Sequence, residues 1–212
     1  MYREIVVRQG LPFIVPPLAA ALLAATVRAY FLAALFFLFA VFVTWFFRNP
    51  KRVSPKGEHF VLSPADGRVI RIAETADSEL AAGYFKKVSI FMSIFDVHVN
   101  RIPYSGTVSA IHYRKGKFFS ADLDKASAQN ERNTIVITTD KGRQLVTVQI
   151  AGLIARRIVC WLTQGMRVKK GAPFGLIRFG SRLEVFLPHD AVLAVKVGDR
   201  VQAGVTILGE LP

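Results

Sequence analysis

The chain has 212 residues, which is enough for one domain with a hydrophobic core and an appendage. Its single cysteine, Cys160, excludes an intrachain disulfide and a cysteine-based metal site. The formal net charge of +13 indicates a polyanionic partner, either nucleic acid or an anionic membrane surface.

Two apolar runs fill most of the first 47 residues. Residues 11–27 and 30–47 carry no charge, and only Arg28 and Ala29 separate them. A helix needs about 20 residues to cross the hydrocarbon of a bilayer, with a range of roughly 17–25. Basic residues flank both runs, so the positive-inside rule places both flanks in the cytoplasm. We therefore expect residues 1–47 to be a membrane anchor on the cytoplasmic face of the cell membrane, either a tight helical hairpin or a shallow re-entrant segment.

Residues 48–212 carry the remaining net charge of +11 and change in character. Pro50, Pro55 and Gly57 indicate a linker into a soluble domain. Five runs then show the alternation or the β-branched enrichment of strands, at 67–73, 86–94, 106–114, 132–140 and 143–152. We therefore expect a mainly β (α+β) domain.

Three local features refine this expectation. A hairpin turn is predicted at Lys141-Gly142 and a tight turn at residues 63–67. Residues 151–162 are the best candidate for a short helix, with a strand as the alternative. Two stretches near the C-terminus, RVKKGAPFG (167–175) and RVQAGVTIL (200–208), form a weak internal repeat. Their pattern of strand, Gly turn and strand is similar to that of barrel-sandwich hybrid domains and supports a compact β architecture.

Three polar residues lie in apolar settings: Asp66, His98 and Ser181. No phosphate-binding glycine loop and no metal-ligand spacing are visible. Taken singly, each residue has a structural explanation: Asp66 as a turn former, His98 as a core or surface histidine, and the Gly180-Ser181 pair as a turn or bulge. Asp96, two residues before His98, allows a local ion pair. Together, Asp, His and Ser are the elements of an activated hydroxyl, but composition cannot show that they meet.

Six sequence blocks occur in a specific order. They are FFRNPKR (46–52), SPADGRV (63–69), FDVHVNR (95–101), NERN (130–133), QIAGLIARRIVC (149–160) and GLIRFGSR (175–182). With these blocks and its apolar N-terminus, the whole chain resembles bacterial phosphatidylserine decarboxylase proenzymes of the short type. The resemblance implies a carboxy-lyase that converts phosphatidylserine to phosphatidylethanolamine and CO₂.

The resemblance also implies that the chain cuts itself between Gly180 and Ser181. Gly180 has no Cβ to shield its carbonyl from the Ser181 hydroxyl, and attack there would replace the amide by an ester. β-Elimination and hydrolysis would then leave a pyruvoyl group, the covalent pyruvate cofactor, at position 181. The products would be a large chain (1–180, beta) and a small chain (181–212, alpha) that stay associated without a covalent link.

The family further implies a Schiff base between the pyruvoyl group and the serine amine of the lipid, which serves as an electron sink. We expect His98 to protonate the resulting carbanion. By the resemblance, Asp66 and a histidine of the FDVHVNR block assist Ser181 in self-cleavage. Longer members carry two histidines there, spaced by three, whereas this chain has Arg101 at the second position. His98 then serves both steps, or Arg101 takes a supporting role.

The positive charge suits an anionic lipid at a membrane surface, where each nearby Lys or Arg contributes about 1 kcal/mol. Candidates for the lipid phosphate or carboxylate are Arg101, Arg132, Arg156 and Arg157, with a solvated surface charge as the alternative for each. We expect phosphatidylserine and the anionic membrane as partners and no nucleic acid. Association into a homo-oligomer is left open.

Two other hypotheses compete with the lipid decarboxylase. A non-enzymatic membrane-anchored adaptor with a hybrid-motif β domain predicts an intact chain and no special role for Ser181. A tethered nucleic-acid-binding module predicts interleaved basic and aromatic residues, which only HYRKGKFF (112–119) offers. Within the first hypothesis, decarboxylation of archaetidylserine remains an alternative, because both lipids share the headgroup.

Overall fold

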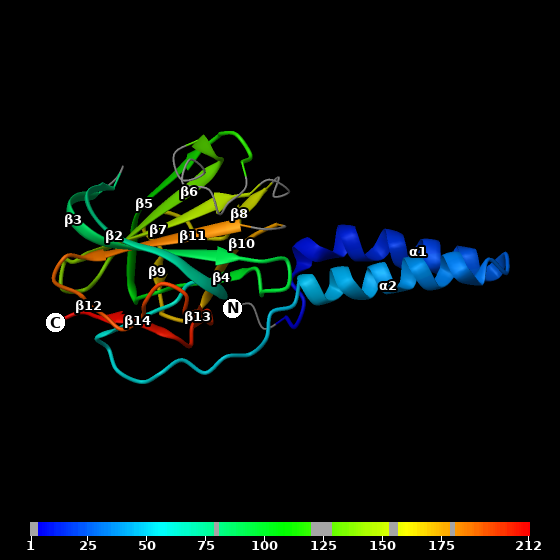
Figure 1. The fold of residues 1–212 in the computed structure, drawn as a ribbon, viewed down its shortest axis with the longest axis horizontal. Coiled ribbons are helices and arrows are strands. Elements are labelled where there is room, and N and C mark those ends of the chain that lie inside the picture. The colour runs from blue at the N-terminus through cyan, green and yellow to red at the C-terminus, as the bar shows by residue number, and fades with distance from the viewer. Residues whose placement is uncertain (1–3, 79–80, 120–128, 153–156, 179–180) are drawn as a thin grey trace. The chain divides into compact units, whose positions relative to one another are not determined.

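The computed structural model describes residues 4–78, 81–119, 129–152, 157–178 and 181–212. The chain divides into two compact units, Met1–Lys51 and Arg52–Pro212. The first unit is helical and the second is built from strands (Figure 1).

The first unit is a helical hairpin. A short 3₁₀ turn (Arg8–Gly10) leads into α1 (Leu11–Thr26), and α2 (Tyr30–Phe46) follows after three residues. Arg28 has a φ of 60°, and its amide donates to the Ala25 carbonyl at 3.0 Å. This left-handed residue ends α1 and reverses the chain, as a C-terminal cap commonly does.

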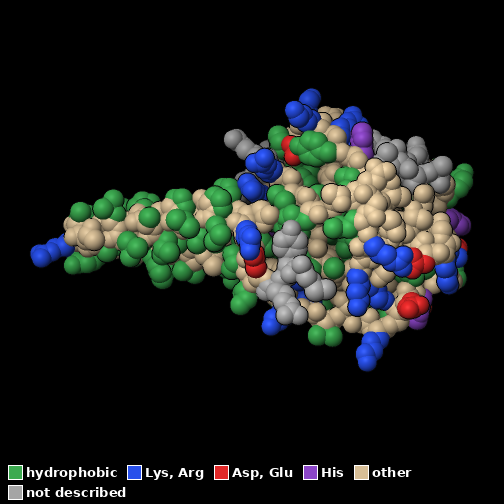
Figure 2. Space-filling view, turned by 180° about the vertical axis from the view of Figure 1, so that it is seen from behind, with side chains coloured by type: hydrophobic (Ala, Val, Ile, Leu, Met, Phe, Trp, Pro, Cys, Tyr) green, Lys and Arg blue, Asp and Glu red, His purple; other side chains and the backbone are tan. Residues whose placement is uncertain are grey.

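Except near its base, where Val43, Phe46 and Phe47 are buried, the hairpin buries small side chains and exposes large apolar ones. Ala21, Ala24 and Ala40 are buried, whereas Phe31 is 81% exposed and Leu23 is 67% exposed. Hydrophobic side chains accordingly cover the visible surface of the helices (Figure 2). Residues 8–26 form a helical segment long and apolar enough to cross a membrane, and α2 is a shorter apolar helix.

The base of the hairpin is closed by its own flanking segments. Val6 and Arg48 form an antiparallel bridge, and the Asn49 amide donates to the Ile5 carbonyl at 2.6 Å. The Arg48 guanidinium lies 3.6 Å from the centroid of the Trp45 ring. An aromatic and a cation thus sit together at the end of the apolar segment, the composition expected where hydrocarbon meets lipid headgroups.

The second unit contains, among its described residues, one large antiparallel sheet and two small ones. The large sheet has the order β13 (Arg200–Val201), β2 (Gly67–Ser78), β3 (Ala81–Met92), β11 (Ser181–Pro188), β7 (Gln144–Ala151), β6 (Arg132–Thr138), β5 (Gly106–Arg114), β9 (Arg167–Val168). One small sheet is β1 (Phe60–Leu62), β14 (Ile207–Glu210), β12 (Val192–Leu193), and the other is β4 (Val99–Arg101), β10 (Pro173–Ile177), β8 (Ile158–Cys160).

The main core lies on one face of the large sheet. Alternate residues of its strands point to that face, so Ile90, Ile135, Leu145 and Leu183 are buried there together. Phe174 of β10 joins the same cluster from a small sheet. The opposite face holds a second cluster around Phe85, Val146, Val148, Ile150 and Phe186.

The weak internal repeat corresponds to a structural repeat. Its two Arg-Val pairs form β9 and β13, the two edge strands of the large sheet, and β10 and β14 of the small sheets follow them. Between the strands lie Gly171 (φ 77°) and Gly204 (φ 72°), and a Cβ on Gly204 would come within 3.3 Å of the Gly171 Cα. The two turns that follow the edge strands of the large sheet therefore lie against each other. A full barrel-sandwich hybrid assignment stays a prediction.

The mainly β class predicted from the sequence is confirmed, and so is the hairpin turn. The Thr139 amide donates to the Arg143 carbonyl at 2.8 Å, and Gly142 has a φ of 75°. The helix predicted for residues 151–162 is wrong where the chain is described. Residues 158–160 form β8, because β10 offers an unpaired strand edge there, and residues 153–156 lie outside the described ranges.

Candidate active site

Ser181 is the first residue of β11, a strand paired on both sides. It lies opposite Met92 of β3 and Ala151 of β7, and none of its surface is exposed. Its side chain points to the core face, where Oγ donates to the Met92 Sδ at 3.4 Å. A thioether sulfur is a weak acceptor, so within the described ranges the buried hydroxyl has no strong partner. Gly180, the other residue of the predicted cleavage site, lies outside the described residues.

His98 lies in the loop between β3 and β4 and is 1% exposed. Its Nδ1 is 2.9 Å from the Asp96 carbonyl oxygen. A carbonyl can only accept a hydrogen bond, so Nδ1 carries the hydrogen and Nε2 holds the lone pair of the neutral ring. His98 thus contacts the Asp96 carbonyl, while the Asp96 Oδ2 accepts hydrogen bonds from the amide and hydroxyl of Ser93, at 2.8 and 2.7 Å.

Asp66 lies in the tight turn before β2 and is 9% exposed. Arg52 Nη2 donates to its Oδ2 at 2.7 Å, and the Ala203 amide donates to its Oδ1 at 2.8 Å. Oδ1 therefore holds the turn that contains Gly204 directly, and Oδ2 holds it through Arg52, whose Nη1 donates to the Ala203 carbonyl at 3.3 Å. Sequence reasoning did not single out Arg52, although it falls within the FFRNPKR block.

The strand β4 connects these positions. The Arg101 amide donates to the Pro64 carbonyl at 2.8 Å, which ties β4 to the turn that carries Asp66. One residue earlier, Asn100 Nδ2 lies 3.8 Å from the Met92 Sδ, the sulfur that Ser181 also contacts. His98 is two residues from Asn100. The structure thus gathers Asp66, His98 and Ser181 around β4, but Ser181 and Asp66 have different hydrogen-bond partners.

Arg101 occupies the place where longer members of the resembled family have a second histidine. Its Nη1 donates to the Gly171 carbonyl at 2.9 Å. Burial lowers the pKa of Arg101, and the charge of Arg52 lowers it further. The Asp66 carboxylate opposes both effects. Arg101 therefore contributes a buried positive charge between the Asp66 turn and Gly171.

A buried row of side-chain amides crosses the core beside Ser181. Gln149 Nε2 donates to Asn100 Oδ1 at 2.8 Å, and Asn133 Nδ2 donates to Gln149 Oε1 at 3.0 Å. All three residues are 3% exposed or less. Sequence reasoning missed them as site residues, although each belongs to a block on which the family resemblance rests.

The side chain after Ser181 points the opposite way. Arg182 is 1% exposed, and its Nη2 is 2.8 Å from Glu184 Oε1 and 3.0 Å from the Ser89 Oγ. Lys87 Nζ adds a longer contact of 3.8 Å to the same Glu184 oxygen. Successive side chains of β11 thus face opposite sides of the sheet. Ser181 lies in a neutral site on one side, and Arg182 lies in a buried charged cluster on the other.

The three candidate arginines within the described residues do not form one group. Arg101 lies with Asp66, whereas Arg132 is paired across β6 and β7 with Ile150, the neighbour of Ala151. The Arg178 amide donates to the Arg157 carbonyl at 3.3 Å, and burial and the nearby charge of Arg157 lower the pKa of Arg178. Arg178 precedes Ser181 by three residues and was missed by sequence reasoning. Arg156 lies outside the described residues.

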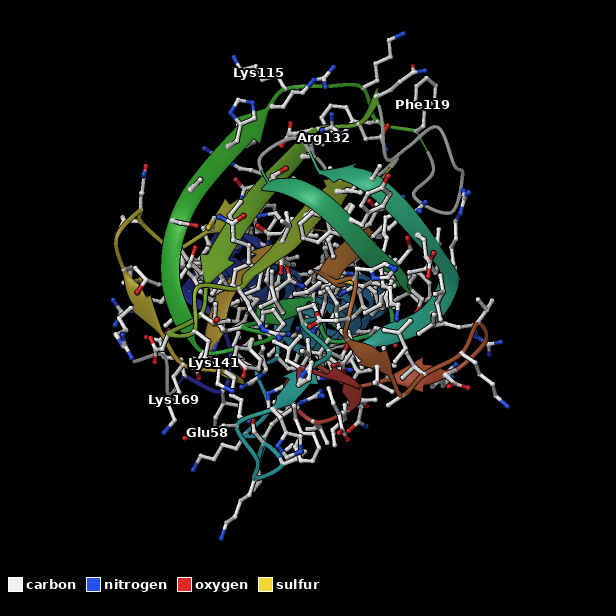
Figure 3. All side chains as sticks on the ribbon, turned by 90° about the vertical axis from the view of Figure 1, so that its left-hand side faces the viewer. Glu58, Lys115, Phe119, Arg132, Lys141 and Lys169 are labelled. Carbon is white, nitrogen blue, oxygen red and sulfur yellow. The ribbon has the colours of Figure 1, made fainter. Side chains whose placement is uncertain are left out.

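An open pocket of the second unit lies far from Ser181. Glu58, Tyr104, Asp140, Lys141 and Lys170 are among its lining residues, next to the β6–β7 turn. Figure 3 shows Lys141 and Glu58 at one end of the curled sheet and Arg132 at the other. Because Ser181 pairs with the far end of β7, this pocket is not its reaction site. Among the described residues, no three His, Cys, Asp or Glu side chains are grouped to hold a metal ion.

The family model and the similar proteins found by comparison all point to one family. The family model for phosphatidylserine decarboxylase matches residues 39–209. A phosphatidylserine decarboxylase proenzyme from Syntrophus aciditrophicus is 52% identical over 205 residues, which cover 96% of each chain. Proenzymes of the same name from Desulfotalea psychrophila and Burkholderia mallei are each 46% identical, over 206 and 208 residues, and the match covers 96% of each relative.

Proposed function

Because the chain belongs to the phosphatidylserine decarboxylase family, and is thus an enzyme of the carboxy-lyase class, we propose that it cuts itself before Ser181 and then decarboxylates phosphatidylserine to phosphatidylethanolamine. One observation carries the proposal. The serine that matches the family cleavage site is fully buried at the start of a strand paired on both sides.

The surroundings of Ser181 fit a covalent pyruvoyl group at this position. Residue 181 is held by pairing with β3 and β7, and its side chain faces Met92 rather than solvent. A pyruvoyl group supplies an electron-withdrawing carbonyl that takes up the electrons left behind when CO₂ departs. Burial excludes water, which would otherwise compete for the reacting atoms.

Self-cleavage begins when the Ser181 Oγ attacks the carbonyl carbon of residue 180. His98 accepts the hydroxyl proton, with Nε2 as its lone-pair nitrogen because Nδ1 is bonded to the Asp96 carbonyl. The bond between that carbon and the Ser181 nitrogen breaks, and the nitrogen takes up a proton to leave an ester. Loss of the Ser181 α-proton then expels the carboxylate of residue 180. Hydrolysis of the dehydroalanine that remains releases ammonia.

The buried residues around β4 support this step and the decarboxylation. Asp66 assists by fixing the Gly204 turn and balancing the charge of Arg101. His98 also donates a proton to the lipid carbon that loses CO₂.

Arg157 and Arg156 form one basic segment that binds the phosphate or carboxylate of the headgroup. Arg132, at the Ser181 end of the sheet, pairs with Ile150, the partner of Arg182, so it would bind the headgroup from the face opposite the Ser181 side chain.

The large and small chains remain associated after the cut. Eight residues of β11 are in register with β3 and six with β7. Residues 181–212 also supply β12, β13 and β14. The small chain therefore contributes strands to two sheets, and its release would expose Leu183, Val185 and Leu187 of the core.

The helical hairpin attaches the enzyme to the membrane that contains its substrate. Its apolar side chains face outward, and the cationic second unit favours an anionic surface. The flanking basic residues favour the cytoplasmic face.

Intact-mass spectrometry of the purified wild type beside Ser181→Ala tests the cleavage. We expect two wild-type chains, 1–180 and 181–212, the small one beginning with a pyruvoyl group, and a whole mutant chain. The Ser109→Ala variant is the control, because the Ser109 hydroxyl bonds to the Val136 carbonyl away from the site. A single uncut wild-type chain that is folded and in membranes would contradict the proposal and favour the adaptor.

A further inference from the structure

The amide of Asn100 is a buried donor without a strong acceptor. Asn100 has no exposed surface, and among the described residues its Nδ2 contacts only the Met92 sulfur, at 3.8 Å. Buried polar groups are nearly always hydrogen-bonded, so a poorly satisfied one requires an explanation.

The orientation of this donor is fixed by the amide row behind it. Asn100 Oδ1 accepts a hydrogen bond from Gln149, which leaves the Nδ2 end directed at Met92. Gln149 is in turn held by Asn133 on the neighbouring strand. Gly175 lies opposite Asn100 in the β4–β10 register, and a Cβ there would come within 3.1 Å of Gln149 Nε2. The absence of this Cβ leaves room for Gln149 to reach β4.

The donor and the nucleophile converge on one sulfur atom. Met92 Sδ is 3.4 Å from the Ser181 Oγ and 3.8 Å from Asn100 Nδ2. Met92 is flexible and its sulfur is a weak acceptor, so an oxygen that gains negative charge near Ser181 can replace it.

We propose that Asn100 donates a hydrogen bond to the oxygen that becomes negatively charged when Ser181 attacks the preceding carbonyl. This inference rests on the proposed self-cleavage and adds a residue to it. As Oγ bonds to the carbonyl carbon of residue 180, the electron pair of the C=O bond moves to its oxygen. That oxygen is then bonded to the same carbon as Oγ, and Oγ and the Asn100 amide already contact one sulfur atom. The electron pair returns to re-form the C=O bond when the bond between that carbon and the Ser181 nitrogen breaks.

Gln149 and Asn133 are positioning residues for this donor, since they act through Asn100. A donor already oriented in a site without water stabilises the developing charge with no reorganisation, which is the principle of an oxyanion hole. The amide row thus gives a reaction role to polar residues that would otherwise weaken a hydrophobic core.

The first test measures the rate of self-cleavage of the full chain, made by cell-free synthesis and sampled over time. Asn100→Asp keeps the side-chain shape and removes the donor when its carboxyl group is ionised, so we expect cleavage about 100-fold slower at high pH. Asn133→Ala should give a smaller loss. Thr147→Val is the matched control with the wild-type rate, because Thr147 is buried on the same strand face as Gln149 and its hydroxyl has no hydrogen bond in the described part of the chain.

The pH dependence of Asn100→Asp distinguishes a donor from a structural residue. The protonated acid carries an O–H and can donate, so the deficit relative to wild type should shrink as the pH is lowered. Burial favours that neutral form. The titratable groups around this position are His98 and Arg101 on the same segment and Cys160 on β8, and dividing by the wild-type rate at each pH cancels their effect.

The outcomes separate this inference from the function on which it rests. A folded Asn100→Asp chain that cleaves at the wild-type rate, or whose deficit does not change with pH, overturns the role of Asn100. Folding is checked by circular dichroism, and Asn100→Ala is the second variant. A wild-type chain that never cleaves overturns the proposed function instead.

Discussion

The helical hairpin and the β unit follow opposite rules for where large side chains lie. In the hairpin, alanines face the neighbouring helix while Phe31, Leu35 and Phe37 point outward. In the β unit, the large apolar side chains point inward and form a continuous core. The hairpin therefore suits a hydrocarbon solvent, where small residues allow close helix packing, and the β unit suits water.

The two units also treat charge differently. The described helices of the hairpin carry no charged residue, and Arg28 lies in the turn between them. The β unit buries charges but pairs them, as in the contacts of Arg52 with Asp66 and of Arg182 with Glu184. A buried charge is tolerated only where a partner and hydrogen bonds replace water.

The largest expected effect comes from breaking a buried pair in the β unit. Arg182→Met leaves Glu184 with the more distant Lys87 and with Ser89, so we expect the free energy of unfolding to fall by about 3–5 kcal/mol. Denaturant unfolding in the uncut Ser181→Ala background measures this change on a single chain. The double change Arg182→Met with Glu184→Leu should recover much of the loss, and a single variant as stable as its parent would contradict the role of the pair.

A charge placed on the hairpin tests the other unit. Leu35→Lys puts an unpaired cation in the middle of α2, where the cost in a membrane is about 3 kcal/mol. We expect binding to phosphatidylserine vesicles to weaken about 100-fold, since each 1.4 kcal/mol is a factor of ten. Vesicle flotation measures it, with Leu35→Ala as the apolar control. Unchanged binding would show that α2 does not enter the hydrocarbon, and self-cleavage should be normal in both variants.

The smallest expected effect concerns the contact between the two repeated turns. Gly204→Ala strains a φ of 72° and places a Cβ 2.9 Å from Arg101 Cδ. Gly142→Ala has the same kind of strain, with a φ of 75°, but no atom within 4 Å. We expect Gly204→Ala to lower the free energy of unfolding by about 1 kcal/mol more than Gly142→Ala does, because only Gly204→Ala overpacks a contact. Equal losses in thermal unfolding would mean that the turns are not closely packed.

Much of the fold could be predicted from the sequence. Alternation in the five predicted runs identified β2, β3, β5, β6 and β7, because the two faces of a strand meet different surroundings. The predicted helix at 151–162 was wrong at β8, whose strand state depends on pairing with β10, a segment more than ten residues away. Local propensity carries no information on such a partner.

The candidate site was predictable only in part. Ser181, His98 and Asp66 were identified by the family blocks, and their catalytic roles stay predictions. Sequence reasoning placed Arg101 with Arg132 and Arg157, but it lies against Asp66 and Gly171. Asn100 was missed because one buried amide in a strand has no local sequence signal. Its importance appears only when Gln149 from another sheet bonds to it.

The sequence by itself determined the apolar N-terminal segment, the mainly β class and the family, and it singled out Ser181 as the serine of the proposed cleavage site. These properties depend on composition, on short-range periodicity and on the order of residues. The tertiary structure alone decided that Ser181 and Arg182 face opposite sides of the large sheet, each with its own buried partners. It also decided that Met92, Asn100, Gln149 and Asn133 gather beside Ser181. The physical reason is that these residues come from four strands, and their contacts exist only after long-range pairing has set the register.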